Sequence, residues 1–544
     1  MLSRSEIDAL FRPDLPDPEH WQRRFPPRDL PAGAMVTRFS PSPTGAMHIG
    51  GVYVAMIDKA VATRSGGVYF VRVEDTDQAR GVEGALAQFD RAFDYFAIQP
   101  TEGADTGGYG PYTQSRRADI YLTYVRELLR TDRAYLCFAT HEELATITAA
   151  QQAAKVPTGY YGRWATWRDA PAPQVRMALA EGRPYVVRFK SPGRPGARVR
   201  YVDLIRGRIE ADENRNDVVI LKSSDQPLPL PTYHLAHAVD DHLMRVNLVV
   251  RAEEWISSVP LHLQLFAALG FEPIPYAHIA PLLKQDGGSK RKLSKRKDPE
   301  ASVDFYIEAG YPAEAVLYYL RGLANGRLAE LPMTEALTAP IELAECGVSG
   351  ALVDVAKLDD ISADYIAGLR GEQILAEVSA WAQTFDPQLA ATIAEERELA
   401  LRALRIEREG VDNPRKDLRR WSQFSGVYGY FFPGLFRTPT LDGPLAELDS
   451  RVVSALVRDF TATYRHLDDP QEWFEQIRTL AARHGFARNQ KEFKANPDKH
   501  HGSIREASQI IRVALTGSTR SPDLYQVARV LGRDEVVRRV SALA

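Results

Sequence analysis

The sequence predicts an α/β protein in which a doubly wound parallel sheet precedes an all-helical carboxy-terminal region. A buried-strand pattern at residues 34–40 is followed by a helix and by a second buried strand at 68–73, within about forty residues. Beyond Val303 the apolar pattern is almost wholly helical. With 544 residues the chain is too long for one core, so we expect several structural units.

The first strand–helix–strand unit can be followed residue by residue. The Pro- and Gly-rich segment 41–47 predicts a tight turn, and apolar residues in 48–64 keep helical spacing. Gly66 and Gly67 stop that helix, and the strand 68–73 follows. Ligands of such sheets bind beyond the carboxyl ends of the strands. Arg38 and Glu74 fall at those ends.

From about residue 113 to 229 the pattern loosens into an α+β insertion. Helices are expected at 115–131 and 141–155, and strands at 185–190 and 196–207. The sheet then resumes, with a strand expected within 243–255, a helix at 258–270 and another strand at 277–284. A further boundary is expected between residues 330 and 380.

The composition indicates the class of protein and its compartment but does not indicate its function. Hydrophobic residues make up 44% and charged residues 26%, which is typical of an ordinary soluble protein. The sequence contains no run of eighteen apolar residues, so no membrane-spanning helix is expected. Residues 1–33 lack an apolar signal core and are expected to form a surface extension. The two cysteines cannot build a disulfide framework, which favours a reducing cytoplasm. A net charge of −3 neither supports nor excludes a nucleic-acid partner.

The first motif that carries chemistry lies at residues 41–51. A tight turn there opens a helix whose first N–H groups can meet phosphate, and Gly50 and Gly51 leave room for a nucleotide base. His48 can donate to phosphate oxygens as charge develops on them. Taken alone, a Pro-rich turn capped by an incidental histidine explains this segment equally well.

The second motif is the basic segment 290–297. An isolated basic octamer is more often a solvated charge run or a localisation signal. Here it follows a strand and a Gly-containing turn, so it is expected in a mobile loop near the carboxyl edge of the sheet. Lys292 and Lys295 could then stabilise charge on a departing pyrophosphate. The two motifs together are far more specific than either alone.

The motifs HIGG at 48–51 and KLSKR at 292–296 resemble the HIGH and KMSKS motifs of class I aminoacyl-tRNA synthetases. Flanking segments narrow the resemblance to glutamyl-tRNA synthetases of the bacterial type. They run in family order, at residues 38–51, 72–77, 110–116, 231–236, 239–244, 251–255 and 521–525.

The resemblance implies a Rossmann-like catalytic domain in two halves, at 34–112 and 230–290. An acceptor-stem-binding insertion would occupy 113–229. The KLSKR loop and a stem-contact helical domain would occupy 291–375, and an α-helical anticodon-binding domain 376–544. Residues 1–33 would be an amino-terminal extension.

The resemblance also implies a site for each substrate. Residues expected to bind glutamate are Arg38, Ser40, Ser42, Glu74, Tyr233, His237 and Arg251. Residues expected to bind ATP are Pro41, Gly45, His48, Gly50, Gly51, Glu254, Leu293, Ser294 and Lys295. Catalytic roles fall to His48, Lys292 and Lys295.

Charge gives these assignments a physical reason. An arginine can hold a carboxylate through two parallel hydrogen bonds, and a carboxylate such as Glu74 can receive the substrate ammonium. Tyr233 would close the side-chain pocket. His237 stands where some members have an asparagine.

The implied reaction joins glutamate to tRNA-Glu. L-glutamate reacts with ATP to give glutamyl-adenylate and pyrophosphate, and the glutamyl group passes to the 3'-terminal adenosine. Mg²⁺ is expected to arrive with ATP. Only Cys137 remains where some relatives bind zinc, so no structural zinc is expected. We expect a cytoplasmic monomer without membrane association.

Four other readings remain open. A glutaminyl-tRNA synthetase is disfavoured by HIGG and by Arg251, and a truncated relative that modifies a tRNA base would lack the carboxy-terminal region. A catalytically impaired paralogue that only binds tRNA is disfavoured by the retention of His48, Lys292 and Lys295. A second copy dedicated to one biosynthetic pathway cannot be distinguished from a housekeeping enzyme.

Overall fold

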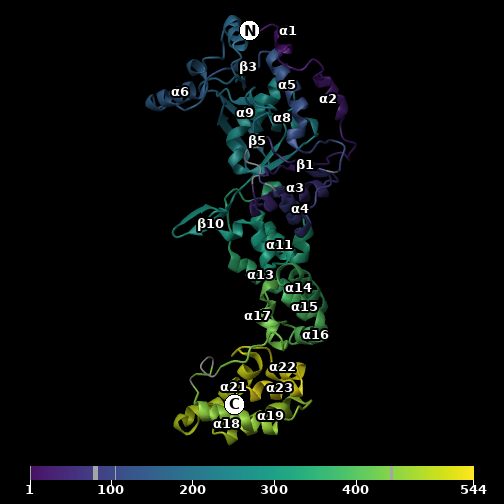
Figure 1. Ribbon diagram of the computed structural model, residues 1–544, viewed down its shortest axis with the longest axis vertical. Helices are drawn as coiled ribbons and strands as arrows, with labels where there is room; N and C mark the ends of the chain where they lie inside the picture. The colour runs from purple at the N-terminus through teal and green to yellow at the C-terminus, as the bar shows by residue number, and fades with distance from the viewer. Residues whose placement is uncertain are drawn as a thin grey trace. The chain divides into compact units, whose positions relative to one another are not determined.

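The computed structural model describes residues 2–43, 45–77, 82, 84–104, 106–440, 445–446 and 448–543. The chain folds into two compact units, which Figure 1 shows in purple to teal and in green to yellow. Unit 1 comprises Met1–Phe305 and Leu317–Asp354, and unit 2 comprises Tyr306–Val316 and Val355–Ala544. Every strand of the described residues belongs to unit 1, so the predicted α/β fold with a helical carboxy-terminal region is confirmed.

The first part of unit 1 contains α1 (Arg4–Asp8), α2 (Pro18–Arg24), β1 (Val36–Phe39), α3 (Ile49–Arg64), β2 (Val68–Val71), α4 (Ala85–Tyr95), α5 (Ala118–Arg130), β3 (Ala134–Cys137), α6 (His141–Ala153), α7 (Ala172–Ala180), β4 (Val186–Phe189), β5 (Arg198–Asp203), β6 (Gly207–Asp212) and β7 (Val219–Leu221). The remaining elements up to the second unit are α8 (Tyr233–Leu243), β8 (Val249–Ala252), the short 3-10 helix η4 (Glu253–Ser258), α9 (Val259–Leu269), β9 (Tyr276–Ile279), β10 (Leu282–Asp286), β11 (Ser289–Lys292), α10 (Val303–Ala309), α11 (Ala313–Ala324), α12 (Met333–Thr338) and β12 (Ala351–Leu352). Helices α10 and α11 each carry residues of both units.

Unit 2 is built from α13 (Val355–Ala367), α14 (Gly371–Phe385), α15 (Pro387–Glu395), α16 (Arg397–Arg405), α17 (Phe424–Tyr428), α18 (Ser450–Thr463), α19 (Pro470–Arg483), α20 (Gln490–Ala495), α21 (Ile504–Thr516), α22 (Leu524–Leu531) and α23 (Arg533–Ser541). One core of this unit surrounds the buried Trp473. A second core gathers apolar side chains of α14, α16 and α17. Among the described residues, no helix is long and apolar enough to cross a membrane.

The unit β1–α3–β2 forms as the sequence predicts. Strands β1 and β2 are parallel, with Val36 opposite Val68. Helix α3 ends before Gly66, whose φ of +66° is the left-handed conformation that glycine adopts readily. At Gly67 a Cβ atom would lie 1.9 Å from the carbonyl oxygen of Met35, so only glycine allows this close approach. The helix therefore returns the chain directly alongside β1.

The second half of the sheet has the strand order β6–β5–β9–β8. Strands β8 and β9 are parallel, and β5 joins β9 through the pair Asp203 and Tyr276. A hairpin from the expected insertion thus extends the sheet of the second half. The Asn247 side chain ties the two halves together. Its Nδ2 donates to the carbonyl of Ala34 at 2.8 Å, and its Oδ1 accepts from the N–H of Val36 at 2.7 Å.

Two expected strands are shorter or divided in the structure. Within 243–255 only β8 is a strand, because α8 runs to Leu243 and Arg245 turns the chain with a φ of +61°. The expected strand 277–284 is split into β9 and β10 at Pro281. Proline has no N–H for a sheet ladder, and β9 pairs with β8 whereas β10 pairs with β11 and β12.

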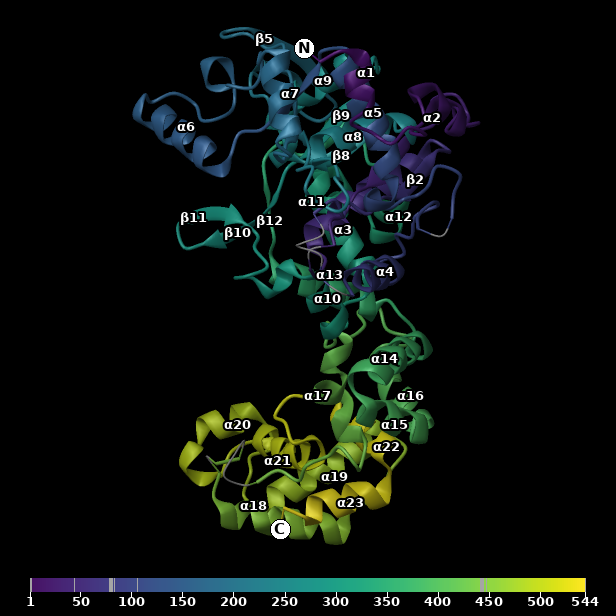
Figure 2. The same cartoon turned by 45° about the horizontal axis from the view of Figure 1, so that its top comes forward.

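The amino-terminal extension packs onto α5. Phe25 is almost fully buried, and the indole of Trp21 donates to the Thr123 hydroxyl at 3.0 Å. Arg126 pairs with Asp17 at 2.8 Å. Figure 2 shows α2 of this extension and α6 of the insertion on opposite sides of unit 1. The described part of the extension, residues 2–33, therefore packs against the surface of the folded core.

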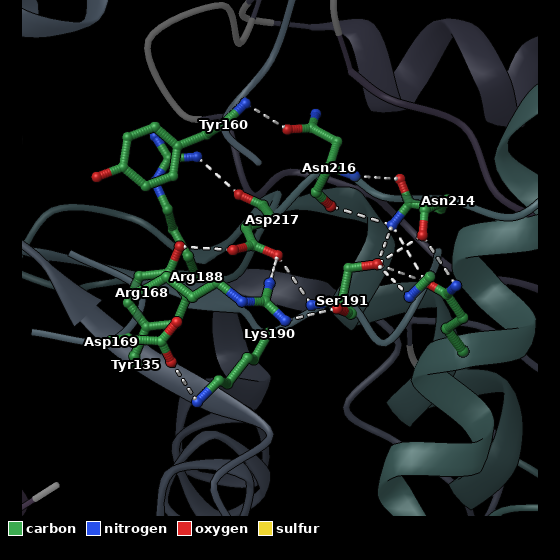
Figure 3. Close-up of polar contacts among 12 residues, drawn as sticks. Tyr135, Tyr160, Arg168, Asp169, Arg188, Lys190, Ser191, Asn214, Asn216 and Asp217 are labelled. Carbon is green, nitrogen blue, oxygen red and sulfur yellow. Dashed lines mark hydrogen bonds and ion pairs between the residues drawn. The ribbon is translucent and has the colours of Figure 1, made fainter. Parts of the chain in front are cut away.

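A buried polar cluster in the insertion is centred on the Asp217 carboxylate (Figure 3). Its oxygens accept hydrogen bonds from the Tyr135 hydroxyl at 2.8 Å and from the N–H of Ser191 at 2.9 Å, and Arg168 completes an ion pair. Cys137, two residues after Tyr135, is buried and unpaired. In the part of the chain that is described, no group of three His, Cys, Asp or Glu residues is arranged to hold a metal ion. Ion pairs and hydrogen bonds hold these strands together, and the absence of zinc stays a prediction.

Candidate active site

A cavity of about 560 Å³ opens at the carboxyl ends of β1, β2, β8 and β9, a volume suited to a small ligand. It brings together predicted residues from both halves of the chain. The predicted residues on its wall are Arg38, Ser40, Ser42, His48, Gly50, Gly51, Glu74, Tyr233, Arg251, Glu254 and Lys292.

Two buried arginines lie on this wall, and their partners differ. Arg38 on β1 is 3% exposed and donates from Nε to Asp241 Oδ2 at 3.0 Å. Arg251 on β8 is 5% exposed, and no described Asp or Glu lies within ion-pair distance of it. A buried charge without a counter-ion is costly. The guanidinium of Arg251 therefore favours a ligand that carries an anion.

Neutral groups hold Arg251 in place. It donates to the Tyr233 hydroxyl at 3.2 Å and to the Trp255 carbonyl at 3.3 Å. Its guanidinium also lies 4.6 Å from the centre of the Tyr276 ring, where a cation–π contact is favourable. These contacts orient the charge without neutralising it.

Behind Arg38 lies a buried ionic network. It contains the guanidinium groups and carboxylates of Arg38, Arg72, Arg117, Glu74, Asp240 and Asp241. Burial alone would raise the pKa of Asp241, but Arg38 and Arg72 outweigh it and hold that pKa well below its usual value. Arg72 donates to Asp241 at 2.5 Å, and Arg117 donates to Asp240 at 2.7 Å. Three cations and three anions balance here, so the network supplies no spare anion to Arg251.

Of the three acidic side chains on the cavity wall, Glu74 is the most buried, whereas Glu253 and Glu254 are more exposed. Its Oε1 accepts from Arg72 at 3.1 Å. Burial raises the pKa of Glu74, although Arg72 and Arg38 oppose that effect. A positively charged ligand group beside this carboxylate would favour its ionised form.

His48 caps the start of α3 and faces the second motif. Its Nδ1 accepts from the N–H of Gly50 at 2.8 Å, so the proton of the neutral ring is on Nε2. That atom lies 3.3 Å from the carbonyl oxygen of Leu293. Burial lowers the pKa of His48, and the nearby Lys295 and Lys292 lower it further. The ring is thus a neutral donor between the two motifs.

The second motif forms part of a hairpin followed by a short loop. Strand β11 pairs with β10 in antiparallel register and ends at Lys292, which contacts Glu254. The Lys295 ammonium reaches the carbonyl of Ala46, in the turn before His48. The expected loop begins only after Lys292, because the first basic residues are held in the strand.

The Asp298 side chain holds this loop in place through hydrogen bonds. Its carboxylate accepts two hydrogen bonds from Arg291, at 2.6 and 2.7 Å, and one from the N–H of Ser294 at 2.9 Å. Asp298 is nearly fully buried, whereas Asp286, a second partner of Arg291, is exposed. The loop that carries Lys295 is therefore anchored at both ends.

Some predicted residues do not line the cavity. They are Pro41, Gly45, Leu293, Ser294, Lys295 and His237. Leu293 is buried beneath the loop. His237 lies behind Tyr233, with the two rings stacked at 5.8 Å, and its Nε2 is 2.9 Å from the Tyr276 hydroxyl. The structure thus places His237 behind the cavity wall, where it packs against Tyr233 and Tyr276.

The sequence did not predict the apolar residues of the cavity wall or the residues that lie behind Arg251. The apolar side comes from Tyr53, Val54 and the segment 279–282. That segment follows strand β9 at the carboxyl edge, which is a signal the pattern did contain. Asp203 and His278 lie behind Arg251, and local periodicity could not reveal them because they come from separate strands.

The chain resembles known proteins over nearly its whole length. Residues 34–360 match the family described as tRNA synthetases class I (E and Q), catalytic domain, and residues 471–544 match an anticodon binding domain. A glutamate–tRNA ligase of Clostridium beijerinckii is 41% identical, with 96% of each chain covered. One from Sorangium cellulosum is 39% identical and covers 96% of this chain and 97% of its own.

A solved structure has the same overall fold. The crystal structure of a glutamate tRNA ligase from Elizabethkingia meningosepticum, in complex with its amino acid, aligns with a TM-score of 0.76 at 27% identity. The alignment covers 93% of this chain and 98% of that one.

Proposed function

The chain belongs to the class I tRNA synthetases of the glutamate and glutamine type, and on that basis we propose that it is a glutamate–tRNA ligase acting through the cavity between β1 and β8. It would activate L-glutamate with ATP and then esterify the 3'-terminal adenosine of tRNA-Glu. The observation that carries the choice of substrate is Arg251, a buried cation with no described counter-ion.

Glutamate satisfies the charges of the cavity. Arg251 and the terminal nitrogens of Arg38 offer N–H groups to its two carboxylates. Glu74 receives the ammonium, and the Tyr233 hydroxyl closes the side-chain end. Glutamine would leave a buried guanidinium facing a neutral amide. Sites built around such a polar contact reject the wrong substrate by roughly 10⁴–10⁵.

Adenylate formation needs no nucleophile from the protein. The α-carboxylate of glutamate attacks the α-phosphate, and catalysis consists of positioning and electrostatics. The Nε2–H of His48 and the ammonium groups of Lys292 and Lys295 would stabilise the charge that develops on the phosphates. Gly50 and Gly51 would leave room for the nucleotide beside α3.

Mg²⁺ would enter with ATP. The described residues form no cage of three acidic or histidine ligands, and Mg²⁺ commonly keeps substrate phosphates and water as most of its ligands. Glu254 is the acidic side chain of the cavity nearest the lysines of the loop, and it contacts Lys292. The metal would supply charge neutralisation at the phosphates.

Transfer requires the tRNA. The insertion would hold the acceptor stem, and unit 2 would bind the anticodon region, in keeping with the family match at residues 471–544. Both cysteines are buried and unpaired, which supports work in a reducing cytoplasm. We propose a monomer, which light scattering on the purified protein would test.

The decisive experiment is glutamate-dependent exchange of pyrophosphate into ATP, with and without tRNA-Glu, followed by charging of tRNA-Glu. We expect exchange with glutamate and at least 10³-fold less with glutamine. Lack of exchange in both conditions, with tRNA binding intact, would instead support an impaired paralogue. Charging of tRNA-Gln beside tRNA-Glu measures whether the enzyme also serves the second tRNA.

A further inference from the structure

Four histidines lie around Arg251, three of them buried and one, His234, partly buried. They are His234 and His237 on α8, His262 on α9 and His278 on β9. Of these, His278 is the one whose ring nitrogen lies within 3.0 Å of the guanidinium, facing Arg251 Nε. His262 is farther, with its Nδ1 at 3.5 Å from both terminal nitrogens.

The bond to Arg251 fixes the tautomer of His278. An arginine Nε can only donate, so the facing Nε2 of His278 must accept and carry no proton. The proton of the neutral ring is then on Nδ1, which donates to Asp203 Oδ2 at 2.6 Å. Burial lowers the pKa of His278, which keeps the ring in this neutral form even though Asp203 opposes the shift.

Asp203 is itself rigidly held. It is the last residue of β5 and is 1% exposed. Its Oδ1 accepts from the N–H groups of Ile205 and Arg206 at 3.0 and 2.9 Å, and its Oδ2 accepts from the N–H of His278 at 3.1 Å. Burial alone would raise the pKa of Asp203, but the hydrogen bonds from His278 and from these N–H groups lower it. A charged, immobile acceptor thus faces Nδ1 of His278.

We propose that Asp203 and His278 are positioning residues for the glutamate carboxylate. The carboxylate of Asp203 selects the Nδ1–H tautomer of His278, and the free Nε2 then binds Nε of Arg251 so that the terminal N–H groups of that arginine face the cavity. This inference rests on the proposed function, because it assumes that Arg251 binds glutamate. It assigns part of the amino-acid site to a hairpin that the sequence places in the insertion.

The geometry gives each residue a distinct effect. A ring in the other tautomer would point an N–H at the N–H of Arg251, and the guanidinium would have to turn away. Arg251 would still be retained by Tyr233 and Trp255, so the cavity would keep its shape while its anion site lost alignment. The loss therefore belongs to glutamate binding and leaves ATP binding unaffected.

Two substitutions of His278 separate the two bonds. The amide of glutamine reaches the place of Nε2, whereas the amide of asparagine reaches only the place of Nδ1. We expect His278→Asn to raise the KM for glutamate about 10- to 100-fold in pyrophosphate exchange, because a charge-assisted hydrogen bond is lost. His278→Gln should restore most of that loss. The KM for ATP and the kcat should stay within about threefold of the wild type.

Asp203→Asn tests the role of Asp203 in selecting the tautomer of His278, since the asparagine keeps an acceptor for Nδ1 but removes the charge. We expect a smaller rise in the KM for glutamate than in His278→Asn. The matched control is His242→Asn, which alters a partly buried histidine of α8 that stacks on Phe271 and does not contact Arg251. Its KM for glutamate should not change.

The outcomes distinguish the proposal from its premise. Absence of glutamate-dependent exchange in the wild type would reject the proposed function itself. Wild-type activity with an unchanged KM for glutamate in His278→Asn would overturn the positioning role of His278, and an unchanged KM in Asp203→Asn would overturn that of Asp203. Equal losses in both His278 variants, with kcat and the KM for ATP also altered, would show a merely structural role.

Discussion

At the scale of single residues, Arg38 and Arg251 show how one cavity uses two buried cations differently. Asp241 neutralises Arg38 within a balanced network, so Arg38 contributes to the fold as well as to the wall. Arg251 is surrounded by neutral rings and hydroxyls and is left for the ligand. The two positions should therefore respond differently to the same substitution.

We predict that Arg251→Gln lowers glutamate-dependent exchange at least about 100-fold without lowering the stability of the fold. Removing one member of a buried ion pair typically costs about 3 kcal/mol, whereas removing an unpaired buried charge does not. Arg38→Gln should therefore lower both activity and stability, because Asp241 loses a partner. Thermal unfolding and exchange assays on both variants check this. Equal destabilisation by the two substitutions would contradict it.

His237 predicts a pH dependence of stability. Burial lowers the pKa of His237 from its usual 6.5 to about 4, although Asp241 opposes the shift. Between pH 6.5 and 4 the unfolded chain binds a proton there that the folded chain does not. The folded state therefore loses about 1.4 kcal/mol per pH unit from this group as the pH falls.

The variant His237→Asn lacks this titration. Its free energy of unfolding should fall less steeply than that of the wild type, by about 1.4 kcal/mol per pH unit between pH 6.5 and 4. Urea unfolding at pH 7, 6 and 5 measures the two slopes. Parallel curves for the two proteins would exclude the assigned shift.

At the scale of elements, the hairpin β10–β11 shows why anchoring matters to a catalytic loop. Strand pairing ends at Lys292. After the loop, the Asp298 carboxylate accepts hydrogen bonds from the Arg291 side chain and from the N–H of Ser294. The ammonium of Lys295 is thus presented by a short segment with fixed ends. Freeing one end should change how well the loop meets the phosphates.

We predict that Asp298→Ala lowers the kcat of pyrophosphate exchange about tenfold and leaves the KM for glutamate within about twofold. The loop loses three hydrogen bonds but does not line the amino-acid side of the cavity. Asp286→Asn is the control, because its exposed ion pair with Arg291 is worth little. A larger effect of Asp286→Asn than of Asp298→Ala would overturn the anchoring role.

Much of the element order could be predicted because the relevant signals are local. The turn after β1, the spacing along α3 and the glycines that end it predicted the β1–α3–β2 segment. They also predicted that Arg38, His48 and Glu74 lie together at the carboxyl edge of the sheet. The division of 277–284 was also marked in the sequence, by Pro281, but a continuous apolar run outweighed it.

The supports of the site were not predictable in the same way. Asp203 meets His278 across 75 positions of sequence, and this contact exists because a hairpin adds to the edge of β9. Strand order is set by tertiary packing, which periodicity within one segment does not record. The position of His237 behind Tyr233 likewise follows from how α8 packs on β9.

At the scale of the whole molecule, chemistry and anticodon binding are assigned to units with separate cores. The cavity belongs to unit 1 alone. The last helices of unit 2 enclose Trp473, which is fully buried and donates to the Tyr464 hydroxyl at 3.2 Å. Damage to that core should affect tRNA binding and spare the cavity.

We predict that Trp473→Ala weakens binding of tRNA-Glu at least about tenfold while ATP binding stays within about twofold of the wild type. Truncating a buried tryptophan to alanine costs about 3–5 kcal/mol, enough to loosen the helices around it. Calorimetric titrations with ATP and with tRNA measure both affinities. Gln471→Ala, on the exposed face of the same helix, is the control. Loss of ATP binding in Trp473→Ala would show that the two cores depend on each other.

The ionic network of the active site also bears on how the protein is made. Arg72 leaves the ribosome 169 residues before its partner Asp241. At typical rates of 5–20 residues per second, that delay is roughly 10–30 s. During this interval the guanidinium groups of Arg38 and Arg72 lack their shared partner Asp241, although Glu74 is already present beside Arg72. The amino-terminal half therefore cannot complete this network until residue 241 has emerged, and until then it should depend on chaperones.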